Sequence, residues 1–304
     1  MSMGVLNNIA ATYAANNLSN TQASLQNVLT QLSSGSRINS GADDAAGLSL
    51  ANGLQANQSA LTQSASNVNL GVGLLQTADG ALSQVNNLLN RAVTLATEAG
   101  NGTLNGSQDA AANQEYQSIL AEINNIGATT TYNGNAVFGA SASIYTSDGT
   151  ATGTSMDTLT IAALKSSSVG DANGTITYTA AAGTTPATIS YAVGAGATDK
   201  IDLSTTDLTS SANARTALTA IGNAITDVAA QRGYLGSQIN TLNSMAGVET
   251  TQSENLASAS NSIMATDYTQ ATSMLSKYQI LTQTGISALA QANSTQQAVT
   301  KLLQ

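Results

Sequence analysis

The chain has 304 residues, no cysteine or histidine, and only 8% charged residues. Metal sites built on imidazole or thiolate are therefore excluded, as are nucleophilic mechanisms centred on histidine or cysteine. A net charge of −9 disfavours nucleic acid and anionic membranes as partners.

The first predicted element is a helix over residues 3–34. Leu18, Leu25 and Leu32 recur every seven residues, and Val28 fills the same stripe. Such a repeat predicts a helix that buries one seam against another helix. We expect it to end at Ser33-Ser34-Gly35, because glycine commonly closes helices.

A second and much longer helix is predicted from about residue 43 to Gly100. Ser40-Gly41-Ala42-Asp43 has the form of a helix-starting cap, and Asp43 and Asp44 lie where the helix dipole favours negative charge. Acid–base chemistry by this pair is disfavoured, because adjacent residues on a helix do not face each other. The heptad stripe consists of Leu54, Leu61, Val68, Leu75, Leu82 and Leu89. Glycines at 71, 73 and 80 are expected to allow a close approach or a local bend.

A third helix, over residues 109–126, has its apolar residues on one face: Tyr116, Ile119, Leu120, Ile123 and Ile126. Tyr132-Asn133-Gly134 predicts a turn.

From about residue 139 the pattern changes to short β-prone segments at 143–146, 158–162, 174–179 and 188–193. Residues 140–204 hold the one proline and are predicted to form a β-rich outer insertion. Asp148, Asp157 and Asp171 lack the spacing of a calcium loop, so we expect them in turns.

Helical periodicity resumes near Leu208 and runs to about Ala246, and a final helix is predicted over residues 249–303. Its apolar side carries Ile263, Met274, Tyr278, Leu281 and Leu289. Helical arms at the two ends of a chain can pair only if the termini come together. The expected fold is mainly α, a long-helix coiled coil or bundle formed by both termini, with a short β-rich central insertion.

Four longer stretches resemble bacterial flagellin, in the correct order along the chain. They are LSSGSRINSGADDAAGLSLANGL, NLGVGLLQTADGALSQVNNLLNRAVTLATEAGNGT, EINNIGATTTYNG and ILTQTGISALAQANSTQQAVTKLLQ. The resemblance implies a terminal coiled-coil layer (D0-like) of residues 1–42 and 262–304. It also implies a helical rod (D1-like) of residues 43–139 and 205–261, around the variable outer segment 140–204.

The function implied by the resemblance is that of a structural subunit of the extracellular flagellar filament, exported unfolded through the flagellar type III system. The implied partners are further copies of the chain, an export chaperone, the filament cap and hook-associated proteins. No catalysis and no cofactor is expected. The alternative is a hook–filament junction protein with homologous terminal helices, in which proline more often follows the acidic pair. An enzyme carried by the middle segment is disfavoured by its small size and its lack of histidine and cysteine.

The predicted subunit-interface residues are Leu18, Leu25, Val28, Leu32, Ile263, Met274, Tyr278, Leu281 and Leu289. Residues 1–35 and 262–304 are expected to be labile in the free subunit and to order on assembly. Arg91, Leu95 and Glu115 match positions that animal innate receptors recognise in some flagellins, and they also suit ordinary contacts between subunits. The sequence has no basic start with a following apolar core and no run near 18 apolar residues, so neither a secretory signal peptide nor a membrane span is expected.

Overall fold

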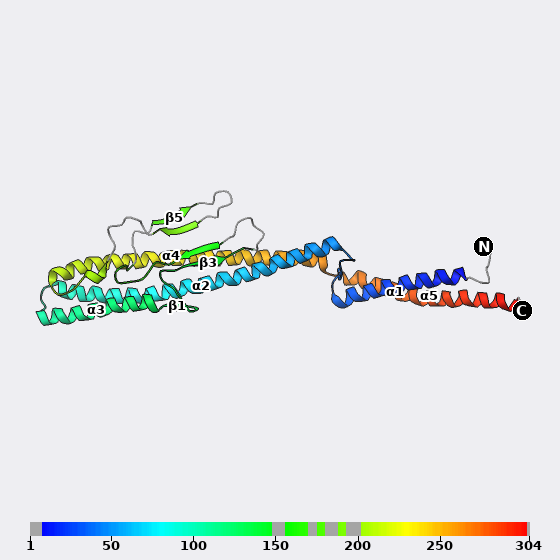
Figure 1. The fold of residues 1–304 in the computed structure, drawn as a ribbon, viewed down its shortest axis with the longest axis horizontal. Helices are drawn as coiled ribbons and strands as arrows, with labels where there is room; N and C mark the ends of the chain where they lie inside the picture. Colours follow the sequence, from blue (N-terminus) through cyan, green and yellow to red (C-terminus); the bar gives the residue numbers. More distant parts are fainter. Residues whose placement is uncertain (1–7, 148–155, 170–174, 180–187, 193–201, 303–304) are drawn as a thin grey trace. The chain divides into compact units, whose positions relative to one another are not determined.

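A computed structural model of the chain describes residues 8–147, 156–169, 175–179, 188–192 and 202–302 (Figure 1). The chain divides into two compact units. Unit 1 contains Met1–Ala56 and Asn255–Gln304, and unit 2 contains Asn57–Glu254. Both boundaries fall inside long helices, α2 (Ala45–Gly100) and α4 (Ser211–Met264). The division into D0-like, D1-like and outer parts stays a prediction.

Unit 1 is built on two paired helices, α1 (Ile9–Ser34) and α5 (Tyr268–Leu302), which lie side by side in Figure 1. The Asn8 side chain caps α1 by accepting a hydrogen bond from the Ala11 amide at 3.0 Å. The same side chain donates to the carbonyl of Ala292 on α5, also at 3.0 Å. Gly35, at a φ of 70°, ends α1 as predicted, because this left-handed conformation favours glycine.

The junction between α4 and α5 is fixed by residues from the other end of the chain. The Arg37 guanidinium donates to the carbonyl of Ile263 at 2.7 Å, at the negative end of the α4 dipole. The Thr266 amide donates to the carbonyl of Gly35 at 3.1 Å. Asp267 then starts α5 by accepting from the Thr269 amide at 2.9 Å. The predicted break between residues 246 and 249 was therefore wrong, since α4 continues to residue 264.

The start of α2 also differs from the prediction. Asp44 caps the helix by accepting from the amide of Gly47 at 2.9 Å. Asp43 lies in the preceding turn, where its carboxylate accepts hydrogen bonds from the backbone amides of Ser40, at 2.9 Å, and Asn39, at 3.0 Å. These hydrogen bonds hold the pKa of Asp43 below its usual value. The predicted cap at Ser40 was wrong, because Ser40 donates to Asp43 instead.

The long helices of unit 2, in the residues that the structure describes, are α2, α3 (Gly106–Thr129) and α4. Their contact faces follow the three- and four-residue spacing expected of packed helices. The α2 face includes Val68, Leu75, Leu82, Leu89 and Ala96, and the α4 face includes Ala217, Ile221, Val228, Leu235 and Leu242. The predicted face of α3 is confirmed, with Tyr116, Ile119, Leu120 and Ile123 buried and Ile126 partly buried.

Among the described residues, three two-stranded antiparallel sheets follow α3. They pair β1 (Thr131–Tyr132) with β2 (Asn135–Ala136), β3 (Ser141–Tyr145) with β4 (Met156–Thr160), and β5 (Thr175–Thr179) with β6 (Thr188–Ala192). Asn133 and Gly134 form the predicted turn, at φ values of 50° and 79°. The four predicted strands are confirmed to within two residues at each end.

The described residues near both ends of the predicted outer insertion are packed into the helical core. Their buried side chains belong to the same cluster as those of the helices, and they are Ile144, Leu159, Ile161, Leu164, Val169 and Leu203. Gly71 explains one contact, because a Cβ there would lie 1.9 Å from Cδ1 of Ile144. A close approach at this glycine is thereby confirmed, whereas Gly80 faces open space. Asp157 lies on β4 opposite Ile144, so its predicted turn was wrong, and Asp148 and Asp171 fall outside the described residues.

Candidate assembly surfaces

The seam between α1 and α5 is narrow. Buried or half-buried positions recur at three- and four-residue spacing, the pattern of a coiled-coil stripe. On α1 they include Ala11, Ala14, Leu18, Thr21, Leu25, Val28 and Leu32, and on α5 they include Ala271, Leu275, Tyr278, Thr282, Gly285, Leu289 and Ala292. A Cβ on Gly285 would lie 3.2 Å from Cδ1 of Leu18, so the two helices approach closely there. Half of these residues are small or polar, and the seam therefore buries little apolar area.

The predicted interface residues divide between this seam and the surface of unit 1. Those on the seam stripes are Leu18, Leu25, Val28, Leu32, Tyr278 and Leu289. Met274 and Leu281 are exposed at 39% and 41%, and Ile263 is half-buried at the end of α4. Contact between any of these nine residues and another subunit stays a prediction.

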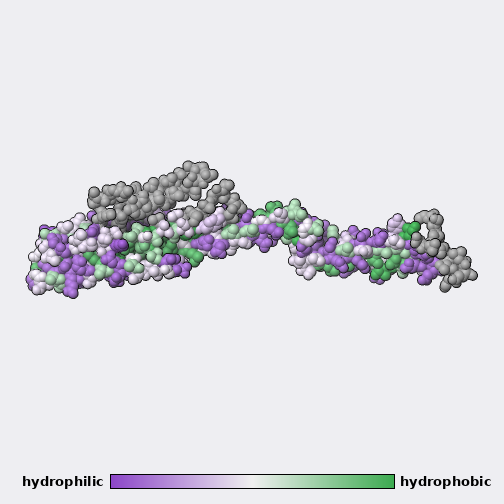
Figure 2. All heavy atoms as spheres, viewed as in Figure 1, coloured by the Kyte–Doolittle hydropathy of each residue, from purple (hydrophilic) through white to green (hydrophobic). Residues whose placement is uncertain are grey.

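Unit 1 leaves more large apolar side chains in solvent than unit 2 does. Nine of the twelve exposed large hydrophobic residues in the described chain belong to unit 1, although it is the smaller unit. They are Ile9, Tyr13, Leu29, Leu50, Tyr268, Met274, Ile280, Leu281 and Ile286. Figure 2 shows that apolar residues, in green, lie among polar ones on the visible face. Exposed apolar side chains on a two-helix unit are a surface that association would bury.

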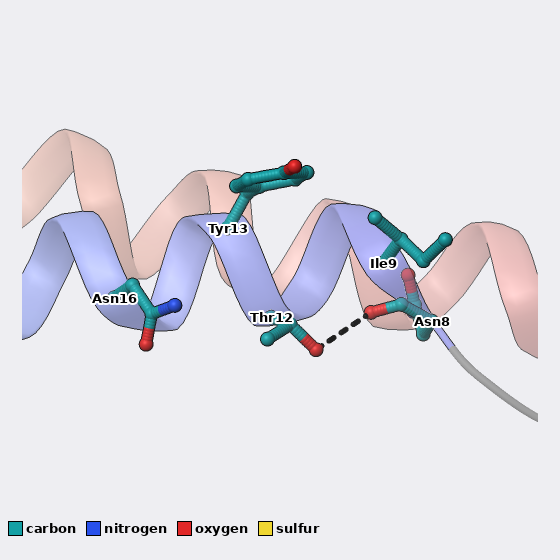
Figure 3. Close-up of a pocket in the computed structure, with 5 residues that line it drawn as sticks. All are labelled: Asn8, Ile9, Thr12, Tyr13 and Asn16. Carbon is teal, nitrogen blue, oxygen red and sulfur yellow. Dashed lines mark hydrogen bonds between the residues drawn. The ribbon is translucent and has the colours of Figure 1, made fainter.

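The N-terminal part of this surface is absent from the predicted interface residues. Ile9 and Tyr13 are one helical turn apart, lie off the seven-residue stripe, and are 62% and 68% exposed. Figure 3 draws their side chains together with those of Asn8, Thr12 and Asn16, and these five residues line an open hollow of about 380 Å³ on α1. Thr12 donates to the carbonyl of Asn8 at 3.2 Å. The i, i+4 spacing of two large apolar residues off the main stripe is the signal that was available.

Arg91 and Glu115 are brought together by the packing of α2 against α3. Their side chains form a bidentate ion pair, with Nε–Oε1 at 2.7 Å and Nη2–Oε2 at 3.0 Å. Hydrogen bonding to Arg91 lowers the pKa of Glu115. Leu95, one turn further along α2, is only 3% exposed and belongs to the helical core. Of the three predicted receptor contacts, two therefore share one exposed patch and the third is buried.

Among the described residues, no group of three or more histidine, cysteine, aspartate or glutamate side chains is placed so that it could hold a metal ion. Within the same residues, no helix has the length and hydropathy needed to cross a bilayer. The functional candidates on the described surface are therefore the exposed apolar side chains of unit 1 and the Arg91–Glu115 ion pair.

Comparison with known proteins agrees with this architecture. The model of the bacterial flagellin N-terminal helical region matches residues 5–143, and that of the C-terminal helical region matches residues 218–303. A flagellin of Listeria monocytogenes is 32% identical over 273 residues, covering 90% of each chain. Flagellin 1 of Proteus mirabilis is 40% identical over 134 residues, covering 44% of this chain and 37% of its own.

Among solved structures, the crystal structure of Bacillus cereus flagellin matches with a TM-score of 0.44 and 27% identity, covering 64% of this chain and 94% of that one. The two family models match the helical ends in the expected order, and the Listeria relative spans nearly the whole chain. The chain belongs to the bacterial flagellin family.

Proposed function

We propose that this protein is a subunit that polymerises into the extracellular flagellar filament and contributes to motility. The observation that supports the proposal is the exposed apolar surface of unit 1. Burying apolar surface contributes about 25 cal/mol per Å². A contact repeated between identical copies along a polymer therefore supplies stability that the narrow α1–α5 seam cannot supply by itself.

The route to the filament is part of the same proposal. Export through the flagellar type III system requires an unfolded chain, and a chain without cysteine has no disulfide to reduce before it is threaded. The proposed partners are an export chaperone, the filament cap, hook-associated proteins and further copies of the chain. The exposed Arg91–Glu115 pair is a proposed contact for a neighbouring subunit or for a host innate receptor, and Leu95 would need local opening to take part.

The experiment is seeded polymerisation of purified full-length protein carrying Leu281→Asp. A charge at a buried contact between copies would raise the critical monomer concentration at least tenfold, which corresponds to about 1.4 kcal/mol per subunit. Gln279→Asp is the matched control, because it adds the same charge at an exposed polar position on the same helix. Circular dichroism of both monomers checks that the fold is retained.

Polymerisation of Leu281→Asp at the wild-type critical concentration would contradict the proposed contact. Wild-type protein that binds filament ends but does not elongate them would instead favour the hook–filament junction role.

A further inference from the structure

Three structural elements of unit 2 meet at one buried hydroxyl. Ser64 on α2 is 1% exposed, and its Oγ lies 2.7 Å from Oε1 of Glu249 on α4. The same Oγ lies 3.2 Å from the carbonyl oxygen of Tyr145, the last residue of β3. Glu249 is itself only 5% exposed, and its Oε2 is buried without a hydrogen-bond partner. A carboxyl group in these surroundings has one neighbouring donor and little contact with water.

Which hydrogen bonds form at this site depends on whether Glu249 is protonated. Ser64 has a single hydroxyl proton and faces two acceptors. An ionised Glu249 takes that proton, because a hydrogen bond to a charged acceptor is the stronger one. The carbonyl of Tyr145 then keeps the hydrogen bond from the side-chain amide of Asn67, whose Nδ2 is 3.5 Å away. A protonated Glu249 instead donates to Oγ of Ser64, and Ser64 donates to the carbonyl of Tyr145.

In the part of the chain that the structure describes, no cation forms an ion pair with Glu249. Helix α2 carries no charged or titratable residue between Asp44 and Asp79. On α4 the nearest charged residues are Arg232, which pairs with Asp79, and Glu254. Strands β3 and β4 carry two titratable residues, Tyr145 and Asp157, and Asp157 lies in register opposite Ile144. Burial raises the pKa of Glu249, and the hydrogen bond from Ser64 opposes this rise.

We propose that Glu249 is a pH-dependent switch that holds the end of β3 against helices α2 and α4. With the proton bound, a continuous chain of hydrogen bonds runs from Glu249 through Ser64 to Tyr145. With the proton lost, Ser64 turns to the carboxylate and the end of β3 is released. All residues of this switch lie in one chain, so it does not depend on polymerisation.

The sign of the effect follows from linkage. A carboxyl whose pKa is higher in the folded than in the unfolded chain stabilises the fold fully below the unfolded value, and this contribution disappears as the pH rises through the folded value. Each tenfold difference between the two acid constants changes the unfolding equilibrium constant by up to about tenfold. Stability from this site therefore falls as the pH rises from near 4.5, the ordinary value for glutamate.

The test uses full-length monomer and two measurements. Carboxyl carbon-13 titration of the wild type should give a pKa for Glu249 above 4.5. Amide exchange over residues 141–147, corrected for the intrinsic pH dependence of exchange, should lose protection as the pH rises through that pKa. In Glu249→Gln the protection should become independent of pH, because the amide is a neutral donor at every pH. Glu254→Gln is the matched control, since this exposed residue of the same helix should leave the profile unchanged.

Ser64→Ala distinguishes the proposed switch from an effect of burial alone, because it removes the hydroxyl while Glu249 stays buried. Loss of the opposing hydrogen bond should raise the pKa of Glu249 further, while the protection of residues 141–147 no longer follows its titration. An ordinary pKa for Glu249 in the wild type would overturn the proposal, and this measurement needs no variant to fold. Wild-type pH dependence retained in Glu249→Gln would overturn it as well.

Discussion

Replacing Gly127 with alanine would place a methyl carbon 2.0 Å from the carbonyl oxygen of Leu164, inside the contact between α3 and the loop after β4. The loop cannot move freely, because Leu164 is 3% exposed and Ser166 makes two hydrogen bonds of 2.8 Å with Asn124. Overpacking of this kind costs about 1–3 kcal/mol. Loss of one Asn124–Ser166 hydrogen bond adds about 1 kcal/mol, and the helix propensity of alanine offsets up to about 1 kcal/mol. We expect a net loss of about 1–3 kcal/mol in the free energy of unfolding.

Gly80→Ala provides the control, because a Cβ at this position of α2 meets nothing within 4 Å. It should stabilise the protein by up to about 1 kcal/mol through helix propensity alone. Urea unfolding of the full-length monomer, followed by circular dichroism, should therefore shift the two midpoints in opposite directions. A Gly127→Ala variant as stable as the wild type would show that the loop yields without cost, and the reasoning from this contact would fail.

Three further predictions concern other contacts. Gly285→Val should overpack the α1–α5 seam against Leu18 and open unit 1 first, so amide exchange should lose protection in α1 while unit 2 is unchanged; equal protection of α1 in this variant and in the wild type would argue against a close approach. Asp44→Ala should cost about 1 kcal/mol and increase exchange at the Gly47 amide, whereas an unchanged rate there would contradict the cap. Arg91→Gln should raise the pKa of Glu115 toward its ordinary value, as measured by carbon-13 titration. Because that pKa is lowered in the folded chain, the stability from the pair is present above the ordinary value and is lost as the pH falls through the lowered one. A Glu115 pKa that does not respond to the substitution would exclude the ion pair in solution.

Local sequence patterns were enough to predict the helices and most of their faces. The heptad stripe of α2 is buried from Leu61 to Leu89, because a regular three-four pattern allows only one side of a helix to face its partner. Gly35 and the Asn133-Gly134 turn were also predictable, because their φ values suit few other residues. In each case the deciding interaction lies within a few residues of the signal.

The errors have a common physical cause, which is that distant residues decide the local outcome. Gly247 resembles a helix stop, yet it faces open space and the helix continues past it. The true end of α4 depends on Arg37, more than 200 positions away, which no local pattern reveals. Likewise, alternation predicted the strands β3 and β4 but not their burial against α2, because the contact depends on the missing side chain at Gly71. For the assembly surface, Leu18 and Leu281 look alike in the sequence, and only the pairing of α1 with α5 separates the half-buried residue from the exposed one.

Unit 1 joins the two ends of the chain, and this has a consequence for the order of folding. The hydrogen bond from Asn8 to Ala292 closes a loop of 284 positions, and the entropy lost in closing a loop grows with its length. Unit 2 lies entirely within that loop, and its own pairing of Ser64 with Glu249 spans 185 positions. Once unit 2 has folded, α2 and α4 are already held together at Ser64 and Glu249. The loop that the pairing of α1 with α5 must still close is therefore far shorter. We therefore expect unit 2 to fold first, and a chain interrupted before α5 to leave the seam face of α1 without its partner.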